Sequence, residues 1–148
     1  MPFRPNVGSG WTRVEEIVAY QLSVELRDRV LALIDANTIP HNFRYRDDMA
    51  AAARSAPANI AEGFERYRHG QFGFHAGVAK GSLGELKAHL EEARARKFIS
   101  DATAKSLIEL LISARKTTSG LIRYLRTTEA PEPVDPRTTE HFVPPSKD

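Results

Sequence analysis

Two stretches of this chain decide its fold: Arg54-Ser-Ala-Pro-Ala-Asn-Ile-Ala-Glu-Gly63 and Ala79-Lys-Gly-Ser-Leu-Gly-Glu-Leu86. Each places small residues and one or two polar side chains where an ordinary helix carries bulky apolar ones. Small residues at helical spacing let two helix backbones approach closely, and a buried Asn, Ser or Glu between them then needs a hydrogen-bond partner. The two stretches therefore predict a pair of closely packed helices joined by polar contacts.

The composition is that of a globular domain without cysteine chemistry. Of the 148 residues, 41% are hydrophobic, 27% are charged and none is cysteine, which excludes disulfides, a thiolate nucleophile and a cysteine-based zinc site. No run of about 18 apolar residues predicts a membrane span. The N-terminal Met-Pro-Phe-Arg-Pro-Asn lacks the apolar core of a signal peptide, so we expect a cytoplasmic protein with no membrane partner.

Apolar periodicity predicts four helices and no strands. The helices are expected at about residues 12–36, 45–67, 71–97 and 100–126. Short connections between amphipathic helices favour an antiparallel up-down-up-down four-helix bundle, so the fold class is all-α. We assign residues 1–12 to a flexible N-terminal arm, 13–126 to the bundle and 127–148 to a proline-rich acidic tail that we expect to be disordered.

The first two helices carry local expectations of their own. Thr12 with Glu15 or Glu16 is expected to cap the start of the first helix. That helix carries two adjacent apolar stripes, and so wide an apolar face could serve both a core and an extra contact. Pro57 is expected to bend the second helix because it removes one backbone hydrogen bond.

Three glycines weaken the third helix, each at a cost of about 1 kcal/mol relative to alanine. They are Gly77, Gly81 and Gly84. We expect close packing or an unusual local geometry to compensate for them.

Charge is distributed unevenly along the chain. Residues 127–148 hold two basic and five acidic side chains, a net charge of −3, which leaves +5 for the remainder because the whole chain carries +2. A mildly basic body is compatible with binding to a polyanion, and ordinary surface solubility is the alternative.

Basic residues gather with aromatic residues in three places, a pattern suited to phosphate contact and base stacking. They lie at the end of the second helix, at the end of the third and along the fourth. The candidate nucleic-acid-binding residues are Arg66, Arg68, Arg94, Arg96, Lys97, Arg115, Lys116, Arg123 and Arg126. Basic residues near helix C-termini also complement the helix dipole without any ligand, and that alternative stays open.

The residues favour no catalytic, metal or cofactor site. The histidines form neither a His-Glu-x-x-His pattern nor the Glu-x-x-His pairs of di-iron bundles, since Glu85 and His89 are four residues apart. The Lys80-Gly-Ser82 segment has neither the residue order nor the preceding strand of a phosphate-binding loop. We interpret Glu62 and Glu85 as acceptors for an Arg, a Ser or a helix terminus, and expect no enzymatic activity.

The motif Ser55-x-Pro57 followed by Asn59-Ile-Ala-Glu-Gly63, together with Gly81-Ser-Leu-x-Glu-Leu86, resembles the four-helix bundle protein family. Its members include proteins encoded by intervening sequences in 23S rRNA genes and relatives of the accessory variability determinant of diversity-generating retroelements. The resemblance covers roughly residues 14–125. It implies a ring-like pentamer without enzymatic activity, nucleic-acid binding and, for the retroelement relatives, a reverse transcriptase as partner.

By this resemblance, the motif positions form a structural polar network between the second and third helices. The residues at these positions are Asn59, Glu62, Gly63, Gly81, Ser82 and Glu85. The chain departs from the commoner family pattern, because Asp48 and Ala50-Ala51 stand where that pattern has a Gln and an Arg-Arg pair. Any ion pair made by those arginines is absent here or supplied by Arg54.

These observations together predict a non-enzymatic homo-oligomeric scaffold, a pentamer, that binds RNA or DNA weakly through basic surface residues. The alternative is a protein-interaction module that partners a reverse transcriptase or another nucleic-acid enzyme without touching nucleic acid itself.

Overall fold

The computed structural model describes residues 11–36, 38–40, 44–67 and 71–127, and the regular elements within these ranges are all helices, without any strand. A short 3-10 helix, η1 (Val14–Glu16), precedes four α-helices. These are α1 (Val18–Asp35), α2 (Arg44–Glu65), α3 (Phe72–Ala95) and α4 (Asp101–Thr127). The bounds of the last three helices lie within two residues of the prediction.

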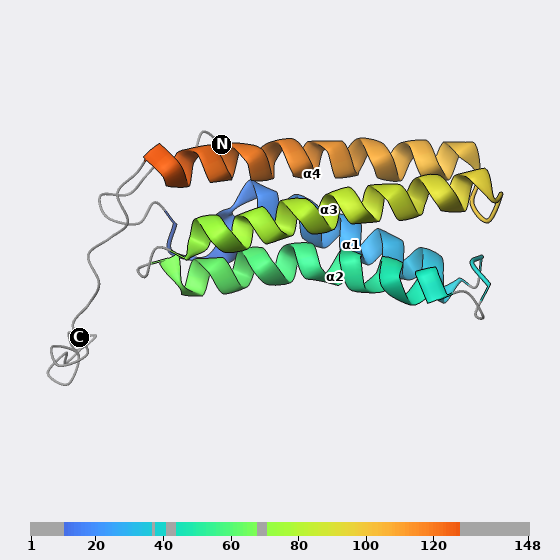
Figure 1. The fold of residues 1–148 in the computed structure, drawn as a ribbon, viewed down its shortest axis with the longest axis horizontal. Coiled ribbons are helices and arrows are strands. Elements are labelled where there is room, and N and C mark those ends of the chain that lie inside the picture. The colour runs from blue at the N-terminus through green and yellow to red at the C-terminus, as the bar shows by residue number, and fades with distance from the viewer. Residues whose placement is uncertain (1–10, 37, 41–43, 68–70, 128–148) are drawn as a thin grey trace, which may run out of the picture.

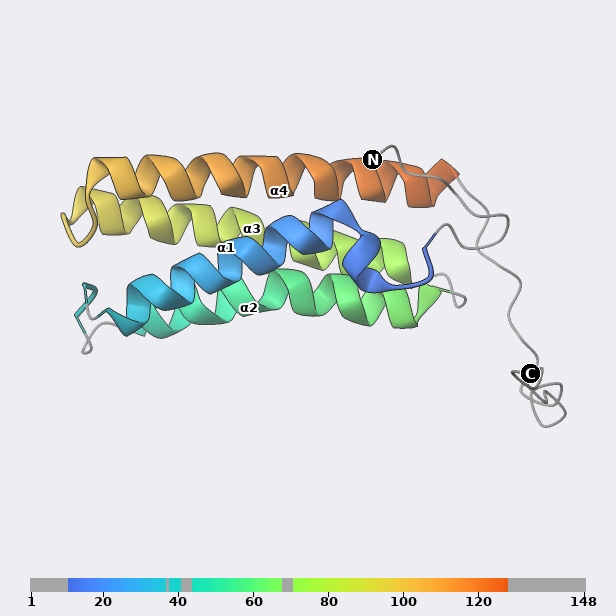
Figure 2. The ribbon, with the colours of Figure 1, turned by 180° about the vertical axis from the view of Figure 1, so that it is seen from behind.

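The four helices run alternately up and down and lie side by side in an elongated bundle (Figures 1 and 2). α1 packs on α2, α2 on α3 and α3 on α4, and α4 closes the bundle by packing on α1. The predicted fold class, an antiparallel four-helix bundle, is confirmed.

Apolar side chains fill the bundle in two clusters along its axis. One cluster includes Val30, Met49, Leu86, Leu90 and Leu111. The other cluster lies nearer the α2–α3 turn and includes Ile60, Tyr67, Phe72 and Leu121. The two predicted apolar stripes of α1 mostly contribute to these clusters, and Val18 is the residue of that face that stays 43% exposed.

The start of the first helix differs from the prediction. A continuous helix from Thr12 was expected, yet Ile17 adopts an extended conformation (φ −82°, ψ 117°) between η1 and α1. Thr12 does bond Glu16, with its N–H donating over 3.1 Å and its hydroxyl over 2.8 Å to the carboxylate. This contact closes the 3-10 turn and does not cap α1. The break lets Ile17 reach the core, where it is 2% exposed.

Trp11, in the segment that the sequence assigned to the N-terminal arm, is attached to this end of the bundle. Its ring lies edge-on to Phe72 of α3 at 6.1 Å and to Tyr124 of α4 at 5.5 Å. Residues 1–10 and 128–148 lie outside the described part of the chain, so the limits of arm and tail remain predictions.

Close packing was expected to compensate for the low helix propensity of three glycines in α3, and the structure does not show such packing. Apart from the nearby backbone of α3 itself, a Cβ atom added at Gly77, Gly81 or Gly84 would meet no described atom within 4 Å. Close packing inside the chain therefore does not explain them. Gly77 and Gly81 are instead exposed on the outer side of the bundle.

Candidate nucleic-acid interface

Polar side chains join α2 to α3 in a short hydrogen-bonded row. The hydroxyls of Ser55 and Ser82 lie 2.8 Å apart across the two helices. The amide of Asn59 donates to the Ser55 carbonyl at 2.9 Å and to its hydroxyl at 3.0 Å. The Asn59 carbonyl oxygen faces His75 Nδ1 at 3.3 Å, so this nitrogen carries the proton in the pairing. The polar groups of the row hydrogen-bond to one another, as expected for a structural contact between two helices.

Gly63 is the one motif glycine that the packing requires. A Cβ there would lie 2.8 Å from the Phe72 ring and 2.9 Å from His75 Cβ, closer than real side chains approach. Only the absence of a side chain lets α2 approach the first turns of α3 this closely.

The remaining motif residues lie outside the row. Glu62 pairs with Arg66 at 2.6 Å and Glu85 with His89 at 3.5 Å, each within its own helix. Gly81 is exposed. Conversely, Ser55 and His75 belong to the row although they were not among the residues assigned to the polar network. The spacing of Ser55 and Asn59 could have indicated that Ser55 belongs to the row, because residues four apart share a helix face.

The structure places eight of the nine predicted basic residues, and they lie in different parts of the bundle. Arg66 lies at the end of α2, where it bonds Glu62 and, at 3.0 Å, Gln71. Arg68 lies outside the described residues. At the opposite end, Arg94 lies in the last turn of α3, and Arg96 and Lys97 lie in the α3–α4 turn. Because α4 has 27 residues, the turn and the end of α4 are about 40 Å apart.

The basic residues at the α3–α4 turn are partly engaged with their neighbours. Arg94 lies 4.0 Å from the Asp101 carboxylate, and the Arg96 guanidinium stands over the Phe98 ring at 5.6 Å. Lys97 is exposed.

The C-terminal half of α4 carries the other four predicted basic residues, all of them exposed. A fifth cation, Lys80 of α3, lies level with them. Arg94 and Asp101 pair across the antiparallel helices, and Lys80 precedes Arg94 by as many residues as Arg115 follows Asp101. We call this set the α3/α4 cationic surface: Lys80, Arg115, Lys116, Arg123 and Arg126.

Neither α3 nor α4 contributes a carboxylate to the α3/α4 cationic surface. The sequence has no Asp or Glu from Phe72 to Gly84 or from Leu110 to Thr127. Among the described residues, none of the five cations forms an ion pair. Five unpaired cations within about 17 Å of helix create a positive potential that attracts polyanions. Lys80 is not among the residues predicted from the sequence, since only the antiparallel register brings it beside α4.

The family of the chain follows from a comparison with protein-family models. The model described as 23S rRNA-intervening sequence protein matches residues 15–120. The chain belongs to this family. A comparison with curated proteins found no match.

The match to the 23S rRNA-intervening sequence protein family covers the polar row between α2 and α3 and part of the α3/α4 cationic surface. It includes the Ser55–Ser82 contact and three residues of the α3/α4 cationic surface, Lys80, Arg115 and Lys116. Arg123, Arg126 and the acidic segment after them lie beyond the matched residues.

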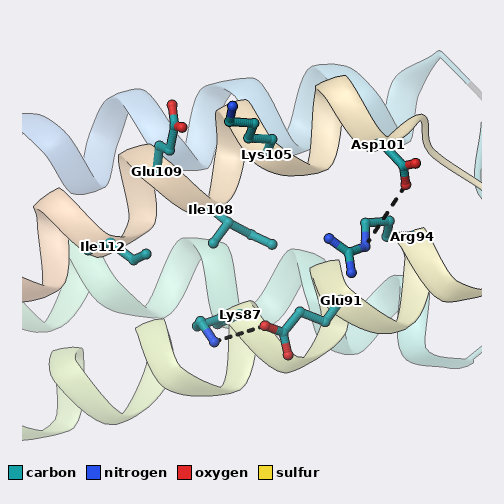
Figure 3. Close-up of a pocket in the computed structure, with 8 residues that line it drawn as sticks. All are labelled: Lys87, Glu91, Arg94, Asp101, Lys105, Ile108, Glu109 and Ile112. Carbon is teal, nitrogen blue, oxygen red and sulfur yellow. Dashed lines mark hydrogen bonds and ion pairs between the residues drawn. The ribbon is translucent and has the colours of Figure 1, made fainter.

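The other half of the α3/α4 seam differs in charge from the cationic surface. There an open groove of about 600 Å³ is lined by basic, acidic and apolar side chains in turn (Figure 3). Lys87 donates to Glu91 at 2.8 Å, and this bond lowers the pKa of the Glu91 carboxyl. Ile108 and Ile112 form the apolar part. Because its charges are of both signs, this groove suits a polyanion poorly.

Two further findings bear on the class of site. Within the described ranges, no three His, Cys, Asp or Glu residues gather as metal ligands would. No helix among the described residues is long and apolar enough to cross a bilayer.

Proposed function

We propose that this chain is a non-enzymatic, self-associating scaffold that binds RNA or DNA weakly through the α3/α4 cationic surface. The observation that carries the proposal is the set of five cations without any carboxylate among them. The family description, 23S rRNA-intervening sequence protein, makes RNA a natural first ligand to test.

The affinity is expected to be low and steeply dependent on salt. Lys and Arg gain binding free energy by releasing counterions from phosphates, so log Kd changes with log salt by about 0.7–0.9 per phosphate contact. If all five cations bind phosphates, the slope is about 4. The surface offers mostly charge and few groups that read bases, so we expect little sequence preference.

The test is a salt titration of binding to a fluorescent single-stranded RNA and to duplex DNA. Replacing Arg115, Lys116 and Arg123 by Gln should reduce the salt slope by about 2–3 and weaken low-salt binding at least tenfold. A control replaces three exposed cations elsewhere, Arg44, Arg54 and Lys105, and has the same net charge. Equal loss in the control, or no binding by the unmodified protein at low salt, would contradict the proposal.

Self-association is proposed to use the outer face of α3. That face combines exposed Gly77 and Gly81 with two exposed apolar side chains, Phe74 at 71% and Val78 at 37% exposure. The packing of the described chain does not require these glycines, and the apolar side chains beside them are exposed to water. A helix of a second copy could pack closely against such a face. The number of copies, five, rests on the family resemblance.

The substitution Gly81→Leu separates assembly from folding. The single chain has room for the side chain, because a Cβ at Gly81 meets nothing within 4 Å. We expect light scattering to show a smaller assembly while circular dichroism stays helical. Ala51→Leu, on the exposed side of α2, is the control and should keep the mass. A monomer at micromolar concentration for the unmodified protein would refute self-association.

The groove beside the cationic surface favours a second candidate function. Its apolar residues Ile108 and Ile112, flanked by charges of both signs, suit an amphipathic segment of a protein such as a reverse transcriptase. Under this alternative, Ile112→Glu abolishes capture of that partner, and the isolated chain binds no nucleic acid at any salt concentration.

A further inference from the structure

We propose that the acidic segment after α4, residues 128–148, folds back onto the α3/α4 cationic surface of its own chain and competes there with nucleic acid. The competition rests on the proposed function. The docking itself rests on charge, position and reach, and it is testable without any nucleic acid.

Charge is the first argument. The segment carries five carboxylates and two basic side chains, whereas the surface carries five cations and no carboxylate. The five cations have no ion-pair partner within the described residues. The other half of the seam already pairs Lys87 with Glu91 and Arg94 with Asp101. An acidic segment therefore gains more on the cationic half.

Position and reach are the second argument. The segment begins directly after Thr127, one residue beyond Arg126 of the surface. Lys116 lies about 16 Å back along α4, since each helical residue rises about 1.5 Å. The eight residues from Thr127 to Asp135 span up to about 26 Å when extended. The first three carboxylates can thus reach every cation of the surface that lies on α4.

Spacing is the third argument. The first three carboxylates, Glu129, Glu132 and Asp135, recur at every third residue and are interleaved with Pro131 and Pro133. Proline favours the polyproline II conformation, in which residues three apart share one side at intervals of about 9 Å. Lys116 and Arg123 are seven residues apart on α4, a rise of about 10 Å. The two series of charges therefore nearly match.

The contact between the segment and the surface is weak, but both belong to one chain and so stay close together. An exposed ion pair contributes little by itself, yet a tethered partner acts at an effective concentration in the millimolar range. A nucleic acid with many phosphates can displace the segment at low salt. A polyanion with high affinity for the cationic surface therefore displaces the segment, and one with low affinity does not.

The docking is tested by zero-length carboxyl-to-amine cross-linking of the full chain at low salt. Cross-links from Glu129, Glu132 or Asp135 to Lys80 or Lys116 are expected, and they should disappear at high salt. Lys87 and Lys105 of the groove serve as internal controls, being lysines of the same two helices outside the surface. Absence of the expected cross-links, or equal linkage to the controls, would overturn the proposal. Mixed heavy- and light-isotope protein must show links within one copy, since links between copies would also overturn it.

The competition is tested with the variant Glu129→Gln, Glu132→Gln, Asp135→Asn. We expect it to bind single-stranded RNA about tenfold more tightly than the unmodified chain at low salt. The matched control, Glu25→Gln, Asp35→Asn, Glu92→Gln, makes the same change in net charge at exposed positions away from the surface. Equal gain in both variants would overturn the competition. If neither variant nor the parent binds while the cross-links form, the proposed function fails and the docking stands.

Discussion

At the scale of single residues, Lys97 shows how the α3–α4 turn is made. It has φ 62°, a left-handed conformation that side chains disfavour. The Phe98 N–H donates to the Ala93 carbonyl at 2.9 Å and the Lys97 N–H to that of Arg94 at 3.0 Å. These are the two bonds of a Schellman motif, whose left-handed position is usually glycine.

Lys97→Gly should stabilise the protein by about 0.5–1 kcal/mol, because glycine adopts this conformation without the steric cost and loses only part of the gain to unfolded-state entropy. Urea unfolding measures the change. Lys97→Ala is the control, since it removes the charge and keeps the strained backbone. Equal stabilisation by both variants would show that charge, not backbone strain, was relieved.

Gly63 and Gly84 are predicted to respond to alanine in opposite directions. At Gly63 the new Cβ meets Phe72 and His75 below 3 Å, so Gly63→Ala should destabilise by about 1–3 kcal/mol. At Gly84 it meets nothing, so Gly84→Ala should stabilise α3 by up to about 1 kcal/mol. Thermal unfolding of dilute protein compares the two. A stable Gly63→Ala variant would mean that α2 and α3 can separate slightly at no cost.

At the scale of elements, the segment before α1 is held by a pH-sensitive contact. Hydrogen bonds from the Thr12 side chain and backbone lower the pKa of Glu16 below its ordinary value of 4.5. A carboxyl with a lowered folded pKa stabilises the folded form above its unfolded pKa, and this contribution disappears as pH falls through the folded pKa. The Thr12–Glu16 contact is therefore complete near neutrality and lost in acid.

Trp11 reports on this contact because it is the single tryptophan of the chain. As the pH falls below 4.5 and through the lowered folded pKa of Glu16, we expect the Trp11 fluorescence to move toward that of solvated tryptophan as the turn loosens. Glu16→Gln should show a displaced signal already at neutral pH and a flatter acid titration, while far-UV circular dichroism of both proteins stays helical. An identical acid titration in the variant would assign the change to other carboxylates.

At the scale of the whole molecule, all four helices run through both core clusters, so the bundle should unfold as one unit. Leu90→Ala, at a fully buried position of the cluster distant from Trp11, should cost about 2–5 kcal/mol. The midpoints from circular dichroism and Trp11 fluorescence should fall together. Separate midpoints would reveal that the Trp11 end unfolds independently.

The sequence predicted the helices well because helix burial follows periodicity. The buried residues of α4 include Leu107, Leu111, Ala114, Thr118 and Leu121, which follow one another at intervals of four, three, four and three residues, the apolar periodicity of a helix. The break at Ile17 was not predictable, since it depends on the core that receives that side chain. The role of Lys80 was equally hidden, because the residue joins the cationic surface only through its place beside α4.

The amino-acid sequence by itself determined the four helices, their antiparallel order and the small-residue approach of α2 to α3. Periodicity, short turns and Gly63 act locally or between sequential neighbours, so they can be read from the order of residues. Tertiary structure alone decided which charges act together. It placed eight of the nine candidate basic residues in different parts of the bundle, and it brought five cations together on a surface to which α3 and α4 contribute no carboxylate. Electrostatic potential sums over distance in space, and sequence order does not measure that distance.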